Sequence, residues 1–423
     1  MERLPGFRDF YPDPLPHSDV WSADCRNFIF DKWRTVARRY GFREYDGPPL
    51  EPLELYTVKS GDEIVGQLYN FTDKGERAVA LRPEMTPTLA RLVAAHERHY
   101  KKPIKWFALP QLFRYERQQK GRLREHFQFN ADIFSEPDPA VDAELVALLI
   151  DSLRAFGLTA DDFVLRLSSR DAWQSFYENR QGDPTQAYSF FQVIDKLERE
   201  AKDQTETKLR ALGFSLDEVL RFIHEAEPVP ALAAILQNLQ ARGLAEFVKI
   251  DYNVIRGLAY YSGAVFEAFD KKGDFRAIAG GGRYDHLVKL ISGGKVDLPA
   301  IGFGMGDVVL TELLKQRKLL PPFGSRIDVV VLIEEEARRG ESLHFVQQLR
   351  DATLAVDYAF NPLKPDKQFK RAIELNAGFT AKIELDEAKA LVVRVKNLKT
   401  RAEQTMPPSA AVEWFKQQFG TKG

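Results

Sequence analysis

Side chains that could bind a charged ligand alternate along residues 125 to 134, which read "EHFQFNADIF". The alternation predicts a β-strand with one polar and one apolar face. The polar face carries His126, Gln128, Asn130 and Asp132, and the apolar face carries Phe127, Phe129, Ala131 and Ile133. Arg114 and Glu116 share one face of the preceding strand-like run "KWFALPQLFRYER". An antiparallel pair would join these groups into a binding floor, and the alternative is an ordinary solvated sheet face.

Two glycine-rich stretches follow much later in the chain, "AGGGRYD" at 279 to 285 and "GFGMGDVVL" at 302 to 310. Neither has the spacing of a dinucleotide-binding fingerprint: in the second stretch Asp307 stands where the third glycine is required, and the first stretch also fails the spacing. Glycine allows the backbone to approach a ligand closely.

Helices and strands must hold these groups in place. Residues 17 to 40 have helical apolar spacing and end at Gly41. Residues 78 to 84 predict a strand that leaves Glu84 at its end. Thr86 is then the expected N-cap of the next helix, with Pro87 at its first position.

The order of strand-like and helix-like segments predicts an α/β (α+β) protein whose first domain is interrupted by an insertion. Residues 1–169 and 249–320 are expected to form the two parts of the first domain, and 170–248 a helical insertion. After a proline-bearing linker at 320–325, residues 326–423 alternate strands and helices as a separate small α/β domain.

Composition limits the class of protein. The net charge of -1 gives no indication of a nucleic-acid partner. The basic clusters at 117–124 and 364–371, taken alone, are most simply explained as solvated surfaces. The single cysteine, Cys25, excludes an internal disulfide and a multi-cysteine zinc site, and no metal site is predicted. No apolar run approaches the roughly 20 residues of a membrane span. We expect a cytoplasmic protein with no signal peptide, since patterned sequence begins at once.

Six segments together resemble a known family. They are "GFRDFYP", "LRPEMTPTLARLV", "FRYERQQKGRLREHFQFNADIF", "RGLAYYSGAVFE", "AGGGRYDHLV" and "GFGMGDVVL". In this order they are similar to the motifs of histidyl-tRNA synthetases, which are class II aminoacyl-tRNA synthetases. The resemblance implies formation of histidyl-adenylate from L-histidine and ATP, transfer of histidine to tRNA(His), and a homodimer. It also implies that residues 1–169 and 249–320 form a catalytic domain with the antiparallel sheet of class II synthetases, and that 326–423 form an anticodon-binding-like domain.

The resemblance also assigns residues. It implies catalytic roles for Arg114 and Arg256, whose planar charged forks suit phosphate and carboxylate oxygens. The histidine-binding residues that it implies are Glu84, Met85, Thr86, Arg114, Gln128, Asp132, Arg256, Tyr260, Tyr261 and Tyr284. Asp132 stands where many members have glutamate. The alternatives are core packing for the tyrosines and a structural ion pair for Arg256.

For ATP, the resemblance implies Arg114, Glu116, Arg122, His126, Phe127 and Gly304, together with Mg²⁺. His126 holds the position expected for the aromatic residue that stacks on adenine, and Phe127 the next, so either residue could stack. The loop 117–124 resembles the segment that meets the tRNA acceptor end, with Gln119 and Lys120 as candidate contacts.

Val309 departs from the family pattern, which usually has an arginine there that binds the γ-phosphate. Some organellar-type members resemble this chain in having a similar "GFGFGD" variant without the arginine. The departure favours a second function, a synthetase-like regulatory subunit of ATP phosphoribosyltransferase. Arg114, Glu116, Arg122 and Arg256 favour the ligase, as does the C-terminal domain that such regulatory subunits generally lack.

Overall fold

The computed structural model describes residues 2–60, 62–115, 123–198, 200–225, 227–255, 260–273, 275–324 and 327–420. The chain divides into two compact units, Met1–Phe10 with Cys25–Pro321, and Tyr11–Asp24 with Pro322–Gly423. The short strands β1 (Phe10–Tyr11) and β2 (Trp21–Ser22) precede the first helix. The candidate site lies in the first unit.

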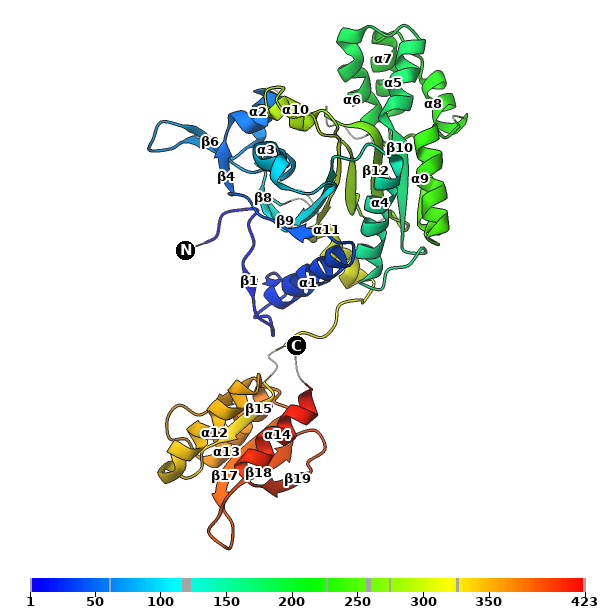
Figure 1. The fold of residues 1–423 in the computed structure, drawn as a ribbon. Helices are drawn as coiled ribbons and strands as arrows, with labels where there is room; N and C mark the ends of the chain where they lie inside the picture. Colours follow the sequence, from blue (N-terminus) through cyan, green and yellow to red (C-terminus); the bar gives the residue numbers. More distant parts are fainter. Residues whose placement is uncertain are drawn as a thin grey trace. The chain divides into compact units, whose positions relative to one another are not determined.

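A nine-stranded sheet forms the centre of the first unit, in the order β11-β10-β12-β13-β14-β9-β7-β3, with β8 paired to β9 (Figure 1). The strands are β3 (Arg43–Glu44), β7 (Ile104–Ala108), β8 (Gln111–Phe113), β9 (Glu125–Phe134), β10 (Phe163–Ser169), β11 (Val248–Ile250), β12 (Ser262–Asp270), β13 (Ala279–Arg283) and β14 (Ala300–Gly306). Within the described strands of this sheet, only the outer pairs β10/β11 and β3/β7 are parallel. The predicted antiparallel sheet is therefore confirmed.

Helix α1 (Ala23–Arg39) covers the apolar face of β9. The Trp33 ring stacks on Phe129 at 5.6 Å, and Phe30 meets Phe127 edge-on at 5.2 Å. The apolar face predicted for β9 is thus a core face. The predicted start of this helix at residue 17 was wrong. Its first residue is Ala23, because the hydroxyl of Ser22 and the carboxylate of Asp24 both bond to Asp13 and fix the preceding chain in a non-helical path.

A small three-stranded sheet lies before the site residues of α3 in the sequence. Strands β4 (Leu50–Pro52), β5 (Asn70–Thr72) and β6 (Ala78–Leu81) pair in the order β4-β6-β5. Helix α2 (Glu54–Ser60) lies between β4 and β5 in the sequence. Helix α3 (Thr86–His96) follows, and α10 (Leu287–Ile291) packs against it. Thr86 was predicted as the N-cap, but Met85 holds that position with helical dihedral angles and no side-chain cap bond. The helix therefore begins one residue earlier than predicted.

Helices alone fill residues 170 to 241 within the described part of the chain. They are α5 (Arg170–Asn179), α6 (Ala187–Asp195), α7 (Lys202–Ala211), α8 (Leu216–Glu225) and α9 (Pro230–Ala241). Helices α5 to α8 gather at one end of the unit, while α9 lies along α4 (Pro139–Arg154) beside the sheet (Figure 1). Ring contacts among Trp173, Phe176 and Phe190 form the core of the helical group.

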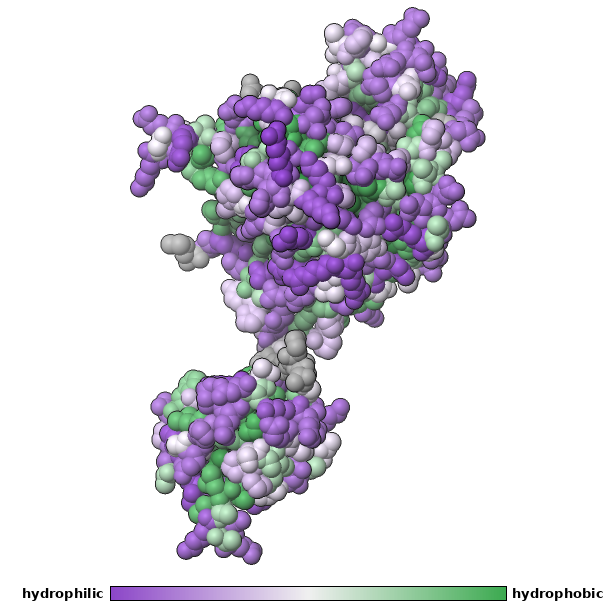
Figure 2. Space-filling model, viewed as in Figure 1, coloured by the Kyte–Doolittle hydropathy of each residue, from purple (hydrophilic) through white to green (hydrophobic). Residues whose placement is uncertain are grey.

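The second unit contains a five-stranded sheet in the order β16-β15-β17-β18-β19. Its elements are β15 (Val329–Leu332), α12 (Arg339–Asp351), β16 (Val356–Tyr358), α13 (Pro365–Glu374), β17 (Phe379–Leu385), β18 (Leu391–Asn397), β19 (Glu403–Met406) and α14 (Pro408–Phe419). Hydrophilic side chains cover most of the visible face of each unit (Figure 2). None of the helices in the described ranges has the length and apolar character needed to cross a bilayer.

Candidate active site

The polar face of β9 forms the middle of the site. Strand β14 pairs with β9 on one side, with Gly302 opposite Asp132 and Gly304 opposite Asn130. Strand β7 pairs on the other side. Gln128 and Asp132 lie on the same face, four residues or about 13 Å apart along the strand. One strand therefore supplies polar groups to both ends of an elongated site.

A buried carboxylate and a buried tyrosine meet at one end. The Tyr284 hydroxyl donates to Asp132 Oδ1 at 2.5 Å, and both side chains are buried. Burial raises the pKa of Asp132 to about 7, and the bond from Tyr284 partly offsets this effect. The second oxygen, Oδ2, has no hydrogen-bond partner among the described residues. It is available to accept from a ligand, and a buried acceptor without a donor is costly.

Gly302 makes room for Asp132. A methyl group at this position would overlap the Asp132 carboxylate. A methyl group at Gly304 would lie 2.6 Å from the Gln128 side-chain carbonyl carbon. The glycines of "GFGMG" therefore first clear space for two polar side chains of the neighbouring strand, a role that the sequence analysis missed.

A second carboxylate joins the same end of the site. Tyr260 donates its hydroxyl to Glu84 Oε2 at 3.2 Å, and its ring meets Tyr284 edge-on at 6.1 Å. Tyr261 packs against Tyr260, with 4.8 Å between ring centroids. We call Glu84, Asp132, Tyr260 and Tyr284 the carboxylate–tyrosine cluster. Met85 and Thr86 begin α3 directly after Glu84, so they adjoin this cluster in the chain.

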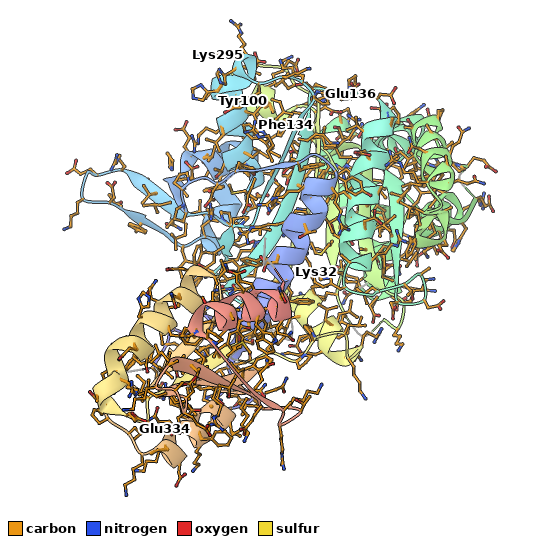
Figure 3. The ribbon with its side chains drawn as sticks, turned by 60° about the horizontal axis from the view of Figure 1, so that its bottom comes forward. Lys32, Tyr100, Phe134, Glu136, Lys295 and Glu334 are labelled. Carbon is orange, nitrogen blue, oxygen red and sulfur yellow. The ribbon has the colours of Figure 1, made fainter. Side chains whose placement is uncertain are left out.

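Packing behind the cluster holds it in place. Tyr284 belongs to an apolar group with Phe134, the last residue of β9, and Tyr100 packs against the same group. The rings of Phe134 and Tyr284 meet edge-on at 6.1 Å. Phe134 and Tyr100 lie near each other at the far end of the sheet from α1 residue Lys32 (Figure 3). The tyrosines thus make core contacts as well as hydrogen bonds, so the core-packing interpretation does not exclude a role in histidine binding.

A cavity of about 240 Å³ opens at the other end of the polar face. We call it the arginine cavity. Its lining comprises Arg114, Leu123, His126, Gln128, Glu267, Arg276, Ala277, Ile278, Ala279, Gly280, Gly304, Gly306, Val308 and Val309. Arg114 links it to the first end, because its Nε donates to the carbonyl of Pro83 at 3.1 Å, next to Glu84.

His126 and Phe127 point to opposite faces of β9. His126 lines the arginine cavity, whereas Phe127 packs against Phe10 and Phe30 on the other face. The structure thus does not bring Phe127 to the predicted ATP site, because neighbouring residues of a strand alternate. Burial, with Arg114 and Arg8 nearby, lowers the pKa of His126 to about 3, so its ring is neutral.

A buried ion cluster holds the start of α11 (Asp307–Gln316). Arg8 donates to Asp307 at 2.8 Å and to Glu125 at 2.6 Å, and the backbone N–H of Phe127 donates to Asp307 at 3.0 Å. Burial raises the pKa of Asp307, against the effect of Arg8. Asp307 is therefore a structural acid, and Val309, two residues later, presents an uncharged side chain to the arginine cavity.

Sequence reasoning missed several of these residues. Arg8 and Glu125 fall within segments that carry the resemblance, but nothing in the sequence indicated that these two residues form an ion pair. Glu267 and Arg276 are charged residues of the cavity lining, and only the pairing of distant strands places them there. Five predicted residues lie outside the described ranges, namely Glu116, Gln119, Lys120, Arg122 and Arg256. Within those ranges no group of three or more His, Cys, Asp or Glu side chains could hold a metal ion.

Comparison with known proteins agrees with this geometry. Residues 22–306 match the family model described as histidyl-tRNA synthetase, and residues 328–418 match the anticodon binding domain. The chain is 44% identical to a histidine–tRNA ligase of Opitutus terrae, covering 100% of this chain and 99% of the relative. A chloroplastic/mitochondrial histidine–tRNA ligase of Arabidopsis thaliana is 37% identical, covering 88% of this chain and 78% of the relative.

A solved structure shares the fold. The crystal structure of histidyl-tRNA synthetase from Nostoc sp. superposes with a TM-score of 0.76 at 23% identity, covering 93% of this chain and 96% of the other. The antiparallel sheet with its polar face, followed by an anticodon-binding domain, is the architecture of a class II aminoacyl-tRNA synthetase. Within that class, this chain belongs to the histidyl-tRNA synthetase family.

Proposed function

We propose that this chain is a histidine–tRNA ligase, which activates L-histidine with ATP and transfers it to tRNA(His). The observation that supports this site for the reaction is that the carboxylate–tyrosine cluster lies beside the arginine cavity, with Arg114 at the boundary between them. Family membership over nearly the whole chain supports the same reaction.

The cluster suits the ammonium and imidazole groups of histidine. Asp132 Oδ2 accepts from the α-ammonium group, since it is buried and has no donor among the described residues. When histidine binds, the Tyr260 hydroxyl can turn its single proton from Glu84 to one ring nitrogen, and Glu84 can accept from the N–H of the other. A site built from paired polar groups rejects amino acids that would leave those groups unsatisfied.

The first step is attack by a carboxylate oxygen of histidine on the α-phosphorus of ATP. A new P–O bond forms, the bond to the β-phosphate oxygen breaks, and pyrophosphate leaves. Negative charge is spread over the phosphate oxygens in the transition state, so fixed guanidinium groups stabilise it. Arg114 lies between the two ends of the site and serves this role, and we assign Arg256 to it from the family pattern.

ATP is placed in the arginine cavity, with adenine against His126 rather than Phe127. The neutral ring of His126 can stack without repelling a base or requiring a counter-ion. Mg²⁺ would accompany the triphosphate, and Glu267 is the carboxylate of the cavity lining that fits it, because Mg²⁺ commonly takes one or two carboxylates plus phosphate oxygens. When bound, the ion would neutralise phosphate charge.

In the second step the terminal ribose hydroxyl of tRNA attacks the carbonyl of the adenylate, and AMP leaves. We propose that the loop at 117–124, with Gln119 and Lys120, contacts the acceptor end. We assign anticodon binding to the second unit, in line with the family match at 328–418. We further propose a homodimer in the cytoplasm. The lone Cys25 agrees with a reducing compartment.

The regulatory-subunit alternative is favoured only by Val309. It would bind histidine without activating it. Histidine-dependent exchange of pyrophosphate into ATP, together with aminoacylation of unfractionated tRNA by labelled histidine, distinguishes the two. We expect both activities from the full chain. Absence of exchange from pure, folded protein would overturn the ligase assignment.

A further inference from the structure

The arginine cavity contains two arginines in its described lining, although the family arginine of the last motif is absent. The ionisable side chains among these residues are Arg114, His126, Glu267 and Arg276. His126 is neutral near pH 7, since its pKa is lowered to about 3. Arg114 and Arg276 are therefore the cationic side chains in the described lining of this cavity.

The two arginines serve different parts of the cavity. Arg114 donates its Nε to the Pro83 carbonyl, which fixes its guanidinium at the boundary with the carboxylate–tyrosine cluster. That boundary is where the α-phosphate must lie if histidine occupies the cluster. Arg114 is thus committed to the reacting phosphate. Besides the Mg²⁺ and Arg122 that the resemblance implies, Arg276 is the cation of the described lining that remains for the outer phosphates.

Strand register brings Arg276 toward Val309. Strands β13 and β14 pair with Ala279 opposite Met305 and Gly280 opposite Gly304. Continuing this antiparallel register backwards from Ala279 runs the chain at Arg276 toward Val308, in the first turn of α11. The same cavity is lined by Arg276, Val308 and Val309. A guanidinium from the β12–β13 connection can therefore reach the space that an arginine at 309 would fill.

The surroundings of Arg276 suit an exchangeable ligand contact. Arg276 is exposed at the cavity, and the neighbouring positions Ala277 and Gly280 are small. Glu267, opposite Gly280 on β12, supplies a carboxylate to the same lining. An arginine at such a place stays charged at any working pH and grips phosphate oxygens in pairs.

We propose that Arg276 binds the β- and γ-phosphates of ATP in this chain, in place of the arginine that Val309 has replaced. This inference rests on the proposed ligase function and makes Arg276 a substrate-binding residue for the activation step. In the family pattern the arginine of the last motif stands at a position that here lies in helix α11. In this chain the connection before β13 supplies the positive charge instead.

The test is a kinetic comparison in histidine-dependent pyrophosphate exchange. Arg276→Ala is expected to raise the KM for ATP about 10- to 100-fold, as expected for loss of a charge-assisted hydrogen bond, with the KM for histidine within about twofold. Arg276→Lys should lose less, because it keeps the charge without the fork. Lys272→Ala is the matched control, an exposed cation of the same connection outside the cavity lining.

A double variant tests whether the two positions are interchangeable. Arg276→Ala with Val309→Arg is expected to recover most of the ATP affinity lost in Arg276→Ala. A KM for ATP unchanged in Arg276→Ala, or a double variant no better than the single one, would overturn the proposal. Calorimetric titration with ATP separates this result from failure of the ligase assignment, because Arg276→Ala should weaken ATP binding even if no exchange occurs.

Discussion

The carboxylate–tyrosine cluster and the arginine cavity face the same strand but are built in different ways. The cluster consists of buried or half-buried side chains tied by mutual hydrogen bonds, Tyr284 to Asp132 and Tyr260 to Glu84. The cavity is lined by glycines, aliphatic groups and two arginines, one of them exposed. Recognition of one amino acid needs fixed partners, whereas binding a triphosphate needs charge in roughly the right place. A charge can therefore move between elements, while the cluster has little such freedom.

The largest expected effect comes from Arg256, which we assign to the reacting phosphate. Arg256→Ala is expected to lower the rate of adenylate formation at least about 100- to 1000-fold, because it removes a donor to the charged transition state. The melting temperature should stay within a few degrees, since the role proposed for Arg256 is in substrate activation and not in folding. Single-turnover adenylate formation measures the effect, and a near-normal rate would remove Arg256 from the mechanism.

The pH dependence of histidine binding sharpens the contrast, because the cluster contains a carboxyl, that of Asp132, with a pKa of about 7. The raised pKa means that Asp132 becomes ionised as pH rises through 7, so affinity for the α-ammonium group should rise with pH and level off above it. Below pH 7 the KM for histidine is expected to increase about tenfold per unit, apart from titration of the substrate ring itself.

Matched tyrosine variants identify the group that titrates. Tyr284→Phe removes the hydrogen bond that lowers the pKa of Asp132, so the midpoint should move to higher pH. Tyr260→Phe, whose hydroxyl bonds to Glu84 instead, should leave the midpoint in place. Identical midpoints in all three proteins would show that the substrate, and not Asp132, sets the profile.

The smallest effect is expected at Val309. Val309→Arg adds a cation to a cavity that already has Arg114 and Arg276, so ATP affinity should change by no more than about tenfold. Steady-state kinetics with varied ATP measure it. A change from an inactive to a fully active protein would mean that the cavity lacks a functional substitute for the missing arginine.

Local pattern predicted the strand β9 and its two faces, since alternation is a property of neighbouring residues. The same alternation put His126 on the polar face and Phe127 on the apolar face, whereas the resemblance left both as candidates to stack on adenine. The packing of Phe127 on α1 agrees with the alternation. Local pattern could not find the partners of Asp132, because Tyr284 lies 152 residues away in the sequence. The displaced start of α1 depends on side-chain bonds to Asp13, which helical periodicity ignores.

The ion cluster of Arg8, Glu125 and Asp307 has a consequence for the beginning of the chain. Arg8 forms ion pairs with two buried carboxylates, Glu125 and Asp307, at sequence separations of 117 and 299. Removing the first ten residues would leave both acids buried without their cation, which costs several kcal/mol. The N-terminal segment therefore links β9 to the start of α11. In a protein without this segment, the part of the arginine cavity formed by the first turn of α11 should become disordered before the rest of the fold.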